Sequence, residues 1–356
     1  MGAGRGPCCR SHRFLALPTG ASTSARARSL AGRNNRREPG RVRPLSSPGS
    51  DAITSVVATL IAGASSPGLD NHAIERVQGA VASRQAPDWL APGLAADILF
   101  AAPGHDLRAI ADRARAALAG APIDVVVQRV AGRRKKLLLS DMDSTMIGQE
   151  CIDELAEHAG MKRQVAAITE QAMRGEVDFE LALRRRVMLL KGLPITAIEE
   201  VIKQRIRLTA GARILVATMR RHGAYTCLVT GGFTAFTDRV AAMIGFDESH
   251  ANRLAVGRDG RLTGEVIAPV FGREAKLATL VELRRRLNLA ANETLAAGDG
   301  ANDIPMIEAA GLGVAYHAKP KVAAAAAARI DHADLTALLY AQGYRRDELV
   351  EPDGRE

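Results

Sequence analysis

Three short segments of this 356-residue chain place acidic, hydroxyl or glycine residues directly after an apolar run. The first is Asp141 to Thr145 (DMDST), which follows residues 136–140. Because side chains alternate along an extended segment, Asp141 and Asp143 should point to the same side. One carboxylate could then attack a phosphorus atom while the other handles the proton of the leaving oxygen, with a divalent cation offsetting their repulsion. By itself the pentapeptide also fits an Asp cap followed by a Ser/Thr turn.

The second segment is Thr230 to Phe233 (TGGF), whose hydroxyl and glycine amides could cradle phosphate oxygens. The third, Gly298 to Asp303 (GDGAND), offers the hard oxygen ligands that suit Mg²⁺. Lys276 lies between them at the start of a predicted helix. Each feature alone is an ordinary turn or a surface lysine. Unrelated turns do not readily explain all three segments in this order.

The elements that must position these residues alternate between short apolar strands and helical patterns. We predict strands at 136–140, 224–229, 294–297 and 312–315, helices between the first two, a hairpin at 253–266 and a helix through the alanine run 323–328. This alternation is typical of a doubly wound parallel sheet, which binds ligands at the carboxyl ends of its strands. We therefore expect an α/β, Rossmann-like core at 136–345, with a helical cap inserted at about 152–210.

The net charge of +9 comes from the N-terminal tail. Residues 1–50 hold ten arginines and one acid, which leaves 38 basic and 38 acidic residues in the rest of the chain. We expect this tail to be disordered, and a transit peptide, a dispensable extension and a misassigned start stay open as explanations. The neutral remainder argues against a nucleic-acid partner, and no apolar run approaches the ~18–20 residues of a membrane span. The four cysteines, Cys8, Cys9, Cys151 and Cys227, lack zinc-site spacing.

Together the three segments and Lys276 resemble the haloacid dehalogenase superfamily of phosphohydrolases, with its Asp-x-Asp-x-Thr motif, Ser/Thr motif, lysine and Gly-Asp-x-x-x-Asp motif. The resemblance covers about residues 136–340. Within the superfamily it is close to the phosphoserine phosphatase family, and it extends into the cap through Glu150, Met173, Phe179 and residues 183–194 (LRRRVMLLKGLP). The pattern at 52–131 resembles the small regulatory, ACT-like α/β domains that precede the phosphatase in longer bacterial relatives.

The resemblance implies a role for each motif residue. Asp141 would be the nucleophile, and Asp143 the general acid and then base, its backbone carbonyl also binding Mg²⁺. Asp299 would be a second carboxylate ligand, with Asp303 supporting the metal shell. The phosphate would be held by Thr230 (where many members have Ser), Gly231, Lys276 and Asn302. Glu150 would bind the substrate ammonium and Arg186 its carboxylate, with Met173 and Phe179 shielding the site. Without the resemblance, Glu150 and Arg186 are better explained as ordinary helix-face charges, and Met173 and Phe179 fit plain packing within the cap as well as they fit shielding.

The function we expect is Mg²⁺-dependent hydrolysis of the small molecule O-phosphoserine through an aspartyl-phosphate, as the last step of serine biosynthesis in the cytoplasm. We expect no nucleic-acid or membrane partner, and a homodimer stays open. The alternatives are another small phosphomonoester, phosphoryl transfer to an alcohol, and a binding protein that has lost its chemistry. Because Asp141, Asp143, Lys276 and Asp299 are all present, the last alternative is disfavoured.

Overall fold

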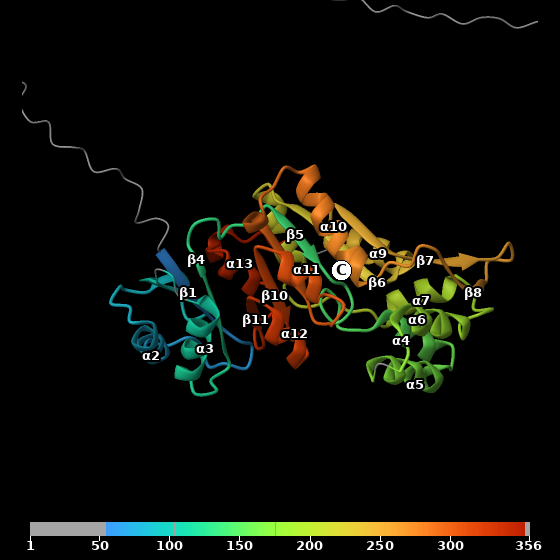
Figure 1. The fold of residues 1–356 in the computed structure, drawn as a ribbon, viewed down its shortest axis with the longest axis horizontal. Coiled ribbons are helices and arrows are strands. Elements are labelled where there is room, and N and C mark those ends of the chain that lie inside the picture. Colours follow the sequence, from blue (N-terminus) through green and yellow to red (C-terminus); the bar gives the residue numbers. More distant parts are fainter. Residues whose placement is uncertain (1–54, 103, 105, 175, 353–356) are drawn as a thin grey trace, which may run out of the picture. The chain divides into compact units, whose positions relative to one another are not determined.

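The computed structural model describes residues 55–102, 104, 106–174 and 176–352, apart from the side chain of Met173. The predicted disordered tail at 1–50, with Cys8 and Cys9, lies outside these residues. The described strands form a seven-stranded sheet in the order β11-β10-β9-β5-β6-β7-β8 and a four-stranded sheet in the order β2-β3-β1-β4 (Figure 1). None of the helices in this part of the chain is long and apolar enough to cross a membrane.

The seven-stranded sheet confirms the predicted α/β class. Its strands are β5 (Leu137–Ser140), β6 (Tyr225–Phe233), β7 (Glu248–Val256), β8 (Leu262–Ile267), β9 (Thr294–Gly298), β10 (Leu312–Tyr316) and β11 (Ala328–Ile330). Neighbouring strands are parallel except for β7 and β8, which form the predicted hairpin. The carboxyl ends of β5, β6 and β9 therefore meet at one edge of the sheet.

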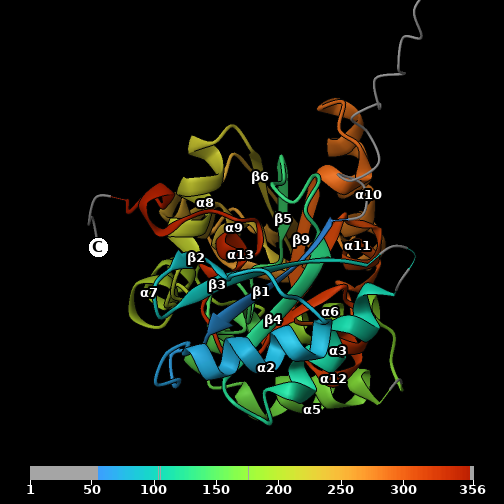
Figure 2. The ribbon, with the colours of Figure 1, turned by 90° about the vertical axis from the view of Figure 1, so that its left-hand side faces the viewer.

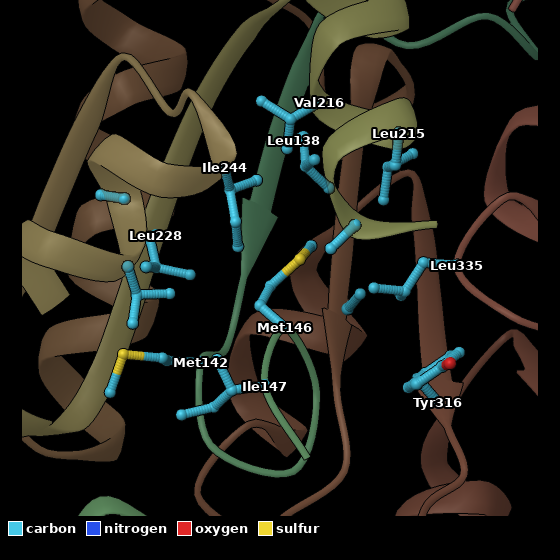
Figure 3. Packing of buried hydrophobic residues seen from close by; sticks show 14 of the residues in the cluster. Leu138, Met142, Met146, Ile147, Leu215, Val216, Leu228, Ile244, Tyr316 and Leu335 are labelled. Atoms are coloured by element: carbon cyan, nitrogen blue, oxygen red, sulfur yellow. The ribbon is translucent and has the colours of Figure 1, made fainter. Parts of the chain in front are cut away.

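Successive side chains of β5 pack on opposite faces of this sheet. Leu137 and Leu139 pack in one apolar cluster with α10 (Arg273–Arg286), α11 (Ile304–Ala309) and α12 (Pro320–Ala325). Leu138 packs on the other face with α8 (Ala212–Arg221) and α9 (Thr234–Ile244), and Figure 3 shows it beside Val216. Because both faces are covered, the strand is a continuous apolar run instead of an alternating one.

The cap consists of α4 (Cys151–His158), α5 (Lys162–Met173), α6 (Phe179–Met188) and α7 (Thr196–Gln204), which all lie between β5 and α8 in the chain. Asp178 begins α6 by accepting a hydrogen bond from the Leu181 amide at 2.9 Å. The β7–β8 hairpin joins the cap, because the Gly192 amide donates to the Leu262 carbonyl at 2.8 Å. The cap is thus attached to the sheet by a backbone contact as well as by its two chain connections.

The N-terminal module contains β1 (Ser55–Ala62), α2 (Asn71–Val81), β2 (Asp88–Ala91), β3 (Ala95–Ala101), α3 (Leu107–Ala117) and β4 (Ile123–Arg129). Asp70 and Asp106 cap its helices by accepting hydrogen bonds from backbone amides at 2.8 and 2.9 Å. Strand β2 was not predicted, because four residues between two prolines carry little periodic signal. The βαββαβ order and antiparallel sheet are ferredoxin-like. That this module is ACT-like and binds a ligand stays a prediction.

Both faces of the four-stranded sheet are covered. Helices α2 and α3 lie side by side over one face (Figure 2), where Val56, Ala58 and Leu60 are buried. On the other face Ile61 and Val126 belong to the same apolar cluster as Leu138 of the large sheet. The division of the chain into 1–50, 52–131 and 136–345, with the cap at about 152–210, stays a prediction.

Two local predictions differ from the structure. The alanine run 323–328 is not one helix, since α12 ends at Ala325 and Ala328 begins β11, paired with Val314 of β10. Helix propensity is a weak preference that strand pairing overrides here. The segment Thr230 to Phe233 is not a free turn after β6 but the end of that strand, with an irregular register against β7.

Candidate active site

The first motif follows β5, and its leading carboxylate lies at the buried centre of the site. The Asp141 amide continues the sheet by donating to the Ala297 carbonyl at 2.9 Å. Lys276, in the first turn of α10, is 0% exposed, and its Nζ donates to Asp141 Oδ1 at 2.7 Å and to Asp303 Oδ1 at 2.6 Å. Met142 points the other way, into the apolar cluster of Figure 3. A buried cation therefore bridges the first and third motifs.

Three carboxylates gather where a metal ion would fit. One oxygen from each of Asp141, Asp299 and Asp303 lies within 4.8 Å of the others. Thr145 Oγ1 donates to Asp299 Oδ1 at 3.3 Å, and the Gly300 amide donates to Asp303 Oδ2 at 3.0 Å. This set of hard oxygen donors fits Mg²⁺. The carboxylate of Asp143 is outside the group, so its predicted ligand role rests on its backbone carbonyl.

The concentration of negative charge is visible in the pKa values of the site. Burial raises the pKa of Asp141 well above its usual range, and the charge of Asp303 adds to the shift while Lys276 opposes it. Burial likewise raises the pKa of Asp299 to about 6, with a further contribution from Asp303. Burial alone would lower the pKa of Lys276, but its two carboxylate partners raise it. A divalent cation would relieve this repulsion.

Asp143 has the environment of a proton donor. Its Oδ1 is buried without a hydrogen-bond partner among the described residues, and its Oδ2 would lie 3.4 Å from a Cβ placed at Gly232. Burial raises the pKa of Asp143 to about 8, and the negative charge of Glu150 is the second cause of this rise. A hydrogen bond from the Cys151 thiol acts in the opposite direction and lowers the pKa. A carboxyl group with a pKa near neutrality suits general acid–base chemistry. The assignment of that role to Asp143 stays a prediction.

The second motif bulges out of its strand pairing. Val229 pairs with His250 and Phe233 with Asn252, so four steps along β6 correspond to two along β7. Within the bulge the Thr230 hydroxyl accepts a hydrogen bond from the Gly232 amide at 2.9 Å. A Cβ at Gly231 would lie only 3.2 Å from the Phe179 ring, so a side chain there would press on the cap.

The third motif depends on its glycines for the approach of its polar side chains. A Cβ at Gly298 would lie 2.5 Å from Asp303 Cγ, and one at Gly300 would lie 2.4 Å from Asn302 Oδ1. Neither distance is compatible with an added side chain, so the two glycines let Asp303 and Asn302 turn back over the loop. Asn302 thereby lies half-buried on the same loop as Asp299.

The cap brings two of the predicted recognition residues towards the motifs. Ser144 Oγ donates to Glu150 Oε1 at 2.8 Å, directly before α4. Arg186 is half-buried on α6, where burial lowers its pKa while the charges of Asp153, Glu150 and Asp143 raise it. Arg186 thus lies within electrostatic range of both Glu150 and Asp143.

Of the two predicted shielding residues, only Phe179 has a described side chain. Its ring lies 3.2 Å from the Cβ position of Gly231 and 3.4 Å from that of Gly272. Phe179 is 38% exposed, so its side chain covers these two glycines from the solvent side. Met173 ends α5, and its side chain lies outside the described residues, so its shielding role stays a prediction.

Sequence reasoning missed three residues that touch this machinery. Thr145 was quoted as part of the first motif without a role, although its hydroxyl contacts Asp299. Cys151 was considered only as a candidate zinc ligand, although it lies beside Asp143. Asn252 carried no signal at all, because it lies within a strand and contacts the site only through distant segments.

Comparison with known proteins agrees with this geometry. Residues 138–308 match the family model of the haloacid dehalogenase-like hydrolases. A phosphoserine phosphatase of Polaromonas sp. is 46% identical over 209 residues, which are 57% of this chain and 88% of the relative. A solved structure from Vibrio cholerae, described as a probable phosphoserine phosphatase without ligand, has a TM-score of 0.67 at 31% identity and covers 83% of this chain and 88% of that one.

Some relatives are longer than the matched region. A phosphoserine phosphatase of Streptomyces coelicolor is 42% identical over 238 residues, or 67% of this chain, but the match spans only 58% of the relative's length. The residues matched by the family model, 138–308, include every motif described above. On the strength of these matches, the chain belongs to the phosphoserine phosphatase family of the haloacid dehalogenase-like hydrolases.

Proposed function

We propose that this chain hydrolyses O-phosphoserine to serine and phosphate, with Mg²⁺, through a phosphorylated Asp141. The observation that carries the proposal is the buried Lys276 bridge between Asp141 and Asp303, with Asp299 beside them. Phosphoryl transfer passes through a loose, strongly anionic transition state, so positioned positive charge is its main requirement. A site with one buried lysine and three converging carboxylates meets that requirement once a divalent cation is bound.

In the first half-reaction, Asp141 attacks the phosphorus atom. Its Oδ1 already accepts from Lys276 and from the Met142 amide at 2.8 Å, so we assign the attack to Oδ2. The new bond joins Oδ2 to phosphorus while the bond from phosphorus to the serine oxygen breaks. Protonated Asp143 gives its proton to that oxygen, and serine leaves as the alcohol. Bound by Asp141, Asp299, Asp303 and the Asp143 carbonyl, Mg²⁺ would neutralise charge on the phosphoryl oxygens.

In the second half-reaction, Asp143 acts as a base. It takes a proton from a water molecule, whose oxygen forms a bond to phosphorus as the bond from Asp141 Oδ2 to phosphorus breaks. Phosphate leaves, and Asp141 returns to its starting state with Asp143 protonated again. Lys276 keeps the Asp141 carboxylate oriented throughout, because its ammonium group has no solvent to exchange with.

The proposed substrate rests on the cap. O-phosphoserine carries an ammonium and a carboxylate beside its phosphate, so it requires one acidic and one basic partner. Glu150 and Arg186 are such a pair, and they lie close enough for the negative charge of Glu150 to raise the pKa of Arg186. Arg186 can bind a carboxylate through two parallel hydrogen bonds, which a lysine cannot. The Phe179 ring would help to exclude water once the cap closes over the substrate.

The test is a phosphate-release screen over small phosphomonoesters in Mg²⁺ and in EDTA, with Asp141→Asn as the inactive control. We expect O-phosphoserine to be hydrolysed fastest, only with the metal, and with the phosphoryl group trapped on Asp141. A phosphorylated intermediate on another residue would overturn the nucleophile, and a faster substrate without an amino acid moiety would overturn the substrate. Added alcohols in a parallel screen would reveal phosphoryl transfer in place of hydrolysis.

We also propose that the serine product serves serine biosynthesis and that the protein acts in the cytoplasm. Cys151 and Cys227 are buried free thiols, which is in keeping with a reducing compartment. The homodimer stays a prediction.

A further inference from the structure

Asn252, on β7, is a buried side chain whose hydrogen bonds all leave its own strand. It is 1% exposed, and its Nδ2 donates to the Gly231 carbonyl at 2.9 Å and to the Phe271 carbonyl at 3.0 Å. Its Oδ1 accepts from the Phe271 amide at 2.7 Å. The two backbone carbonyls need a donor, which the side-chain NH₂ group of asparagine supplies, and the backbone amide needs an acceptor, which its side-chain oxygen supplies. An aspartate in this place would put a carboxylate oxygen, in the position of Nδ2, against both carbonyl oxygens.

The two segments that Asn252 joins are both parts of the phosphate site. Gly231 lies in the bulge of β6, where the strand has left its regular pairing with β7. Phe271 precedes Gly272, whose carbonyl accepts from the Lys276 amide at 3.1 Å in the first turn of α10. The side chain therefore replaces a backbone pairing that the bulge has removed, and it does so between the glycine loop and the helix that carries the buried lysine.

The same two segments also support the cap. Phe179 lies over Gly231 at 3.2 Å and over Gly272 at 3.4 Å, both measured to the position of an added Cβ. Asn252 thus fixes the spacing of two glycines that receive the ring. A change in that spacing would move the lysine helix, the glycine loop and the ring contact together.

From this arrangement we propose that Asn252 is a positioning residue that holds the Gly231 loop and the Lys276 helix in register for one phosphoryl group. The inference rests on the proposed function to the extent that Gly231 and Lys276 bind phosphate. Asn252 itself touches no reacting atom. Its effect is to let the loop amide and the lysine act on the same anion, so its loss should weaken anion binding and not only stability.

The experiment compares Asn252→Asp with Thr226→Val in the full chain. Thr226 is a matched control: it is 0% exposed, and it bonds Asp247 at 2.9 Å at the other end of the same strand pair. The probe is orthovanadate, a phosphate analogue, in Mg²⁺. Its affinity is measured from inhibition of para-nitrophenyl phosphate hydrolysis and from the rise it causes in melting temperature, which needs no turnover.

We expect Asn252→Asp to weaken orthovanadate binding by about tenfold to hundredfold, the loss typical of a displacement near 1 Å in an active site. Thr226→Val should lower the melting temperature while leaving orthovanadate affinity within about twofold, since it lies away from the anion. If Asn252→Asp does not fold, Asn252→Thr, which keeps one donor, takes its place in the same comparison.

Unchanged orthovanadate affinity in a folded Asn252 variant would overturn the inference and leave Asn252 a purely structural residue. Failure of the proposed function looks different. In that case the wild-type chain would bind orthovanadate and cleave para-nitrophenyl phosphate but not O-phosphoserine, and the comparison of variants would stand.

Discussion

Among the described residues, Lys276 is the only one that forms an ion pair with Asp141. Its replacement by methionine removes that charge while keeping a side chain of similar length. Lys276 and Asp303 are 0% exposed and Asp141 is 5% exposed, so two carboxylates would be left in the interior without their shared partner. Breaking a buried ion pair by removing one partner costs about 3–5 kcal/mol. Since Asp141 can take up a proton in response, we expect about 3 kcal/mol at pH 8 in EDTA, at the lower end of that range.

The cost should depend on pH in a defined direction. The pKa of Lys276 is higher in the folded state than the ordinary value of 10.5 that applies to the unfolded chain. Lys276 therefore stabilises the folded state to its full extent at every pH below 10.5. In the methionine variant, the already raised pKa of Asp141 rises further, because Lys276 was lowering it. A protonated Asp141 repels Asp303 less, so the loss should shrink to about 1 kcal/mol at pH 5.

Urea denaturation followed by circular dichroism, at pH 5 and pH 8 in EDTA, measures both values. Lys162→Met is the matched control, because it breaks an ion pair of similar length, 2.6 Å to Glu157, on an exposed surface. We expect that variant to unfold like the wild type at both pH values. A Lys276→Met loss that equals the control, or that is the same at pH 5 and pH 8, would refute the reasoning. Phosphate release should fall by roughly 10²–10³ in the same variant.

Three further predictions concern the acid–base residue, specificity and the metal. Asp143→Asn should slow both formation and hydrolysis of the phosphorylated intermediate in stopped-flow measurements, and wild-type hydrolysis would exclude its acid–base role. Arg186→Ala should lower kcat/KM for O-phosphoserine by a factor equivalent to about 2–4 kcal/mol, but barely change kcat/KM for para-nitrophenyl phosphate. Replacement of the exposed Arg185 by alanine should change neither value. Equal losses on both substrates would assign Arg186 to the cap fold. In EDTA, thermal stability should fall as pH rises from 4 through 8. Burial raises the pKa of Asp299 to about 6 and that of Asp143 to about 8, and a carboxyl group with a raised pKa in the folded state loses its contribution to stability as it ionises. Mg²⁺ should reverse that trend, and a melting temperature that rises with pH in EDTA would contradict it.

Local patterns were enough to predict the framework of the molecule. The α/β class and most strands of the large sheet follow from apolar runs of a few residues. The order of the motifs along the chain also predicted that Asp141 and Asp299 follow strands whose carboxyl ends meet at one sheet edge, with Lys276 at the start of a helix between the second and third motifs. Residue roles such as those of Glu150 and Arg186 came only with the family resemblance, because a helix-face charge looks the same whether or not it binds a ligand.

The tertiary structure decided what depends on segments far apart in the sequence. Ala328 became a strand because Val314 was available to pair with it, against its helix propensity. Phe179 covers Gly231 and Gly272 although they lie 52 and 93 positions further along the sequence. Asn252 joins two loops only once β6 has bulged away from β7. The physical reason is common to these cases: a side chain's partners across the fold are set by packing, and sequence periodicity reports which side is buried but not what lies opposite it.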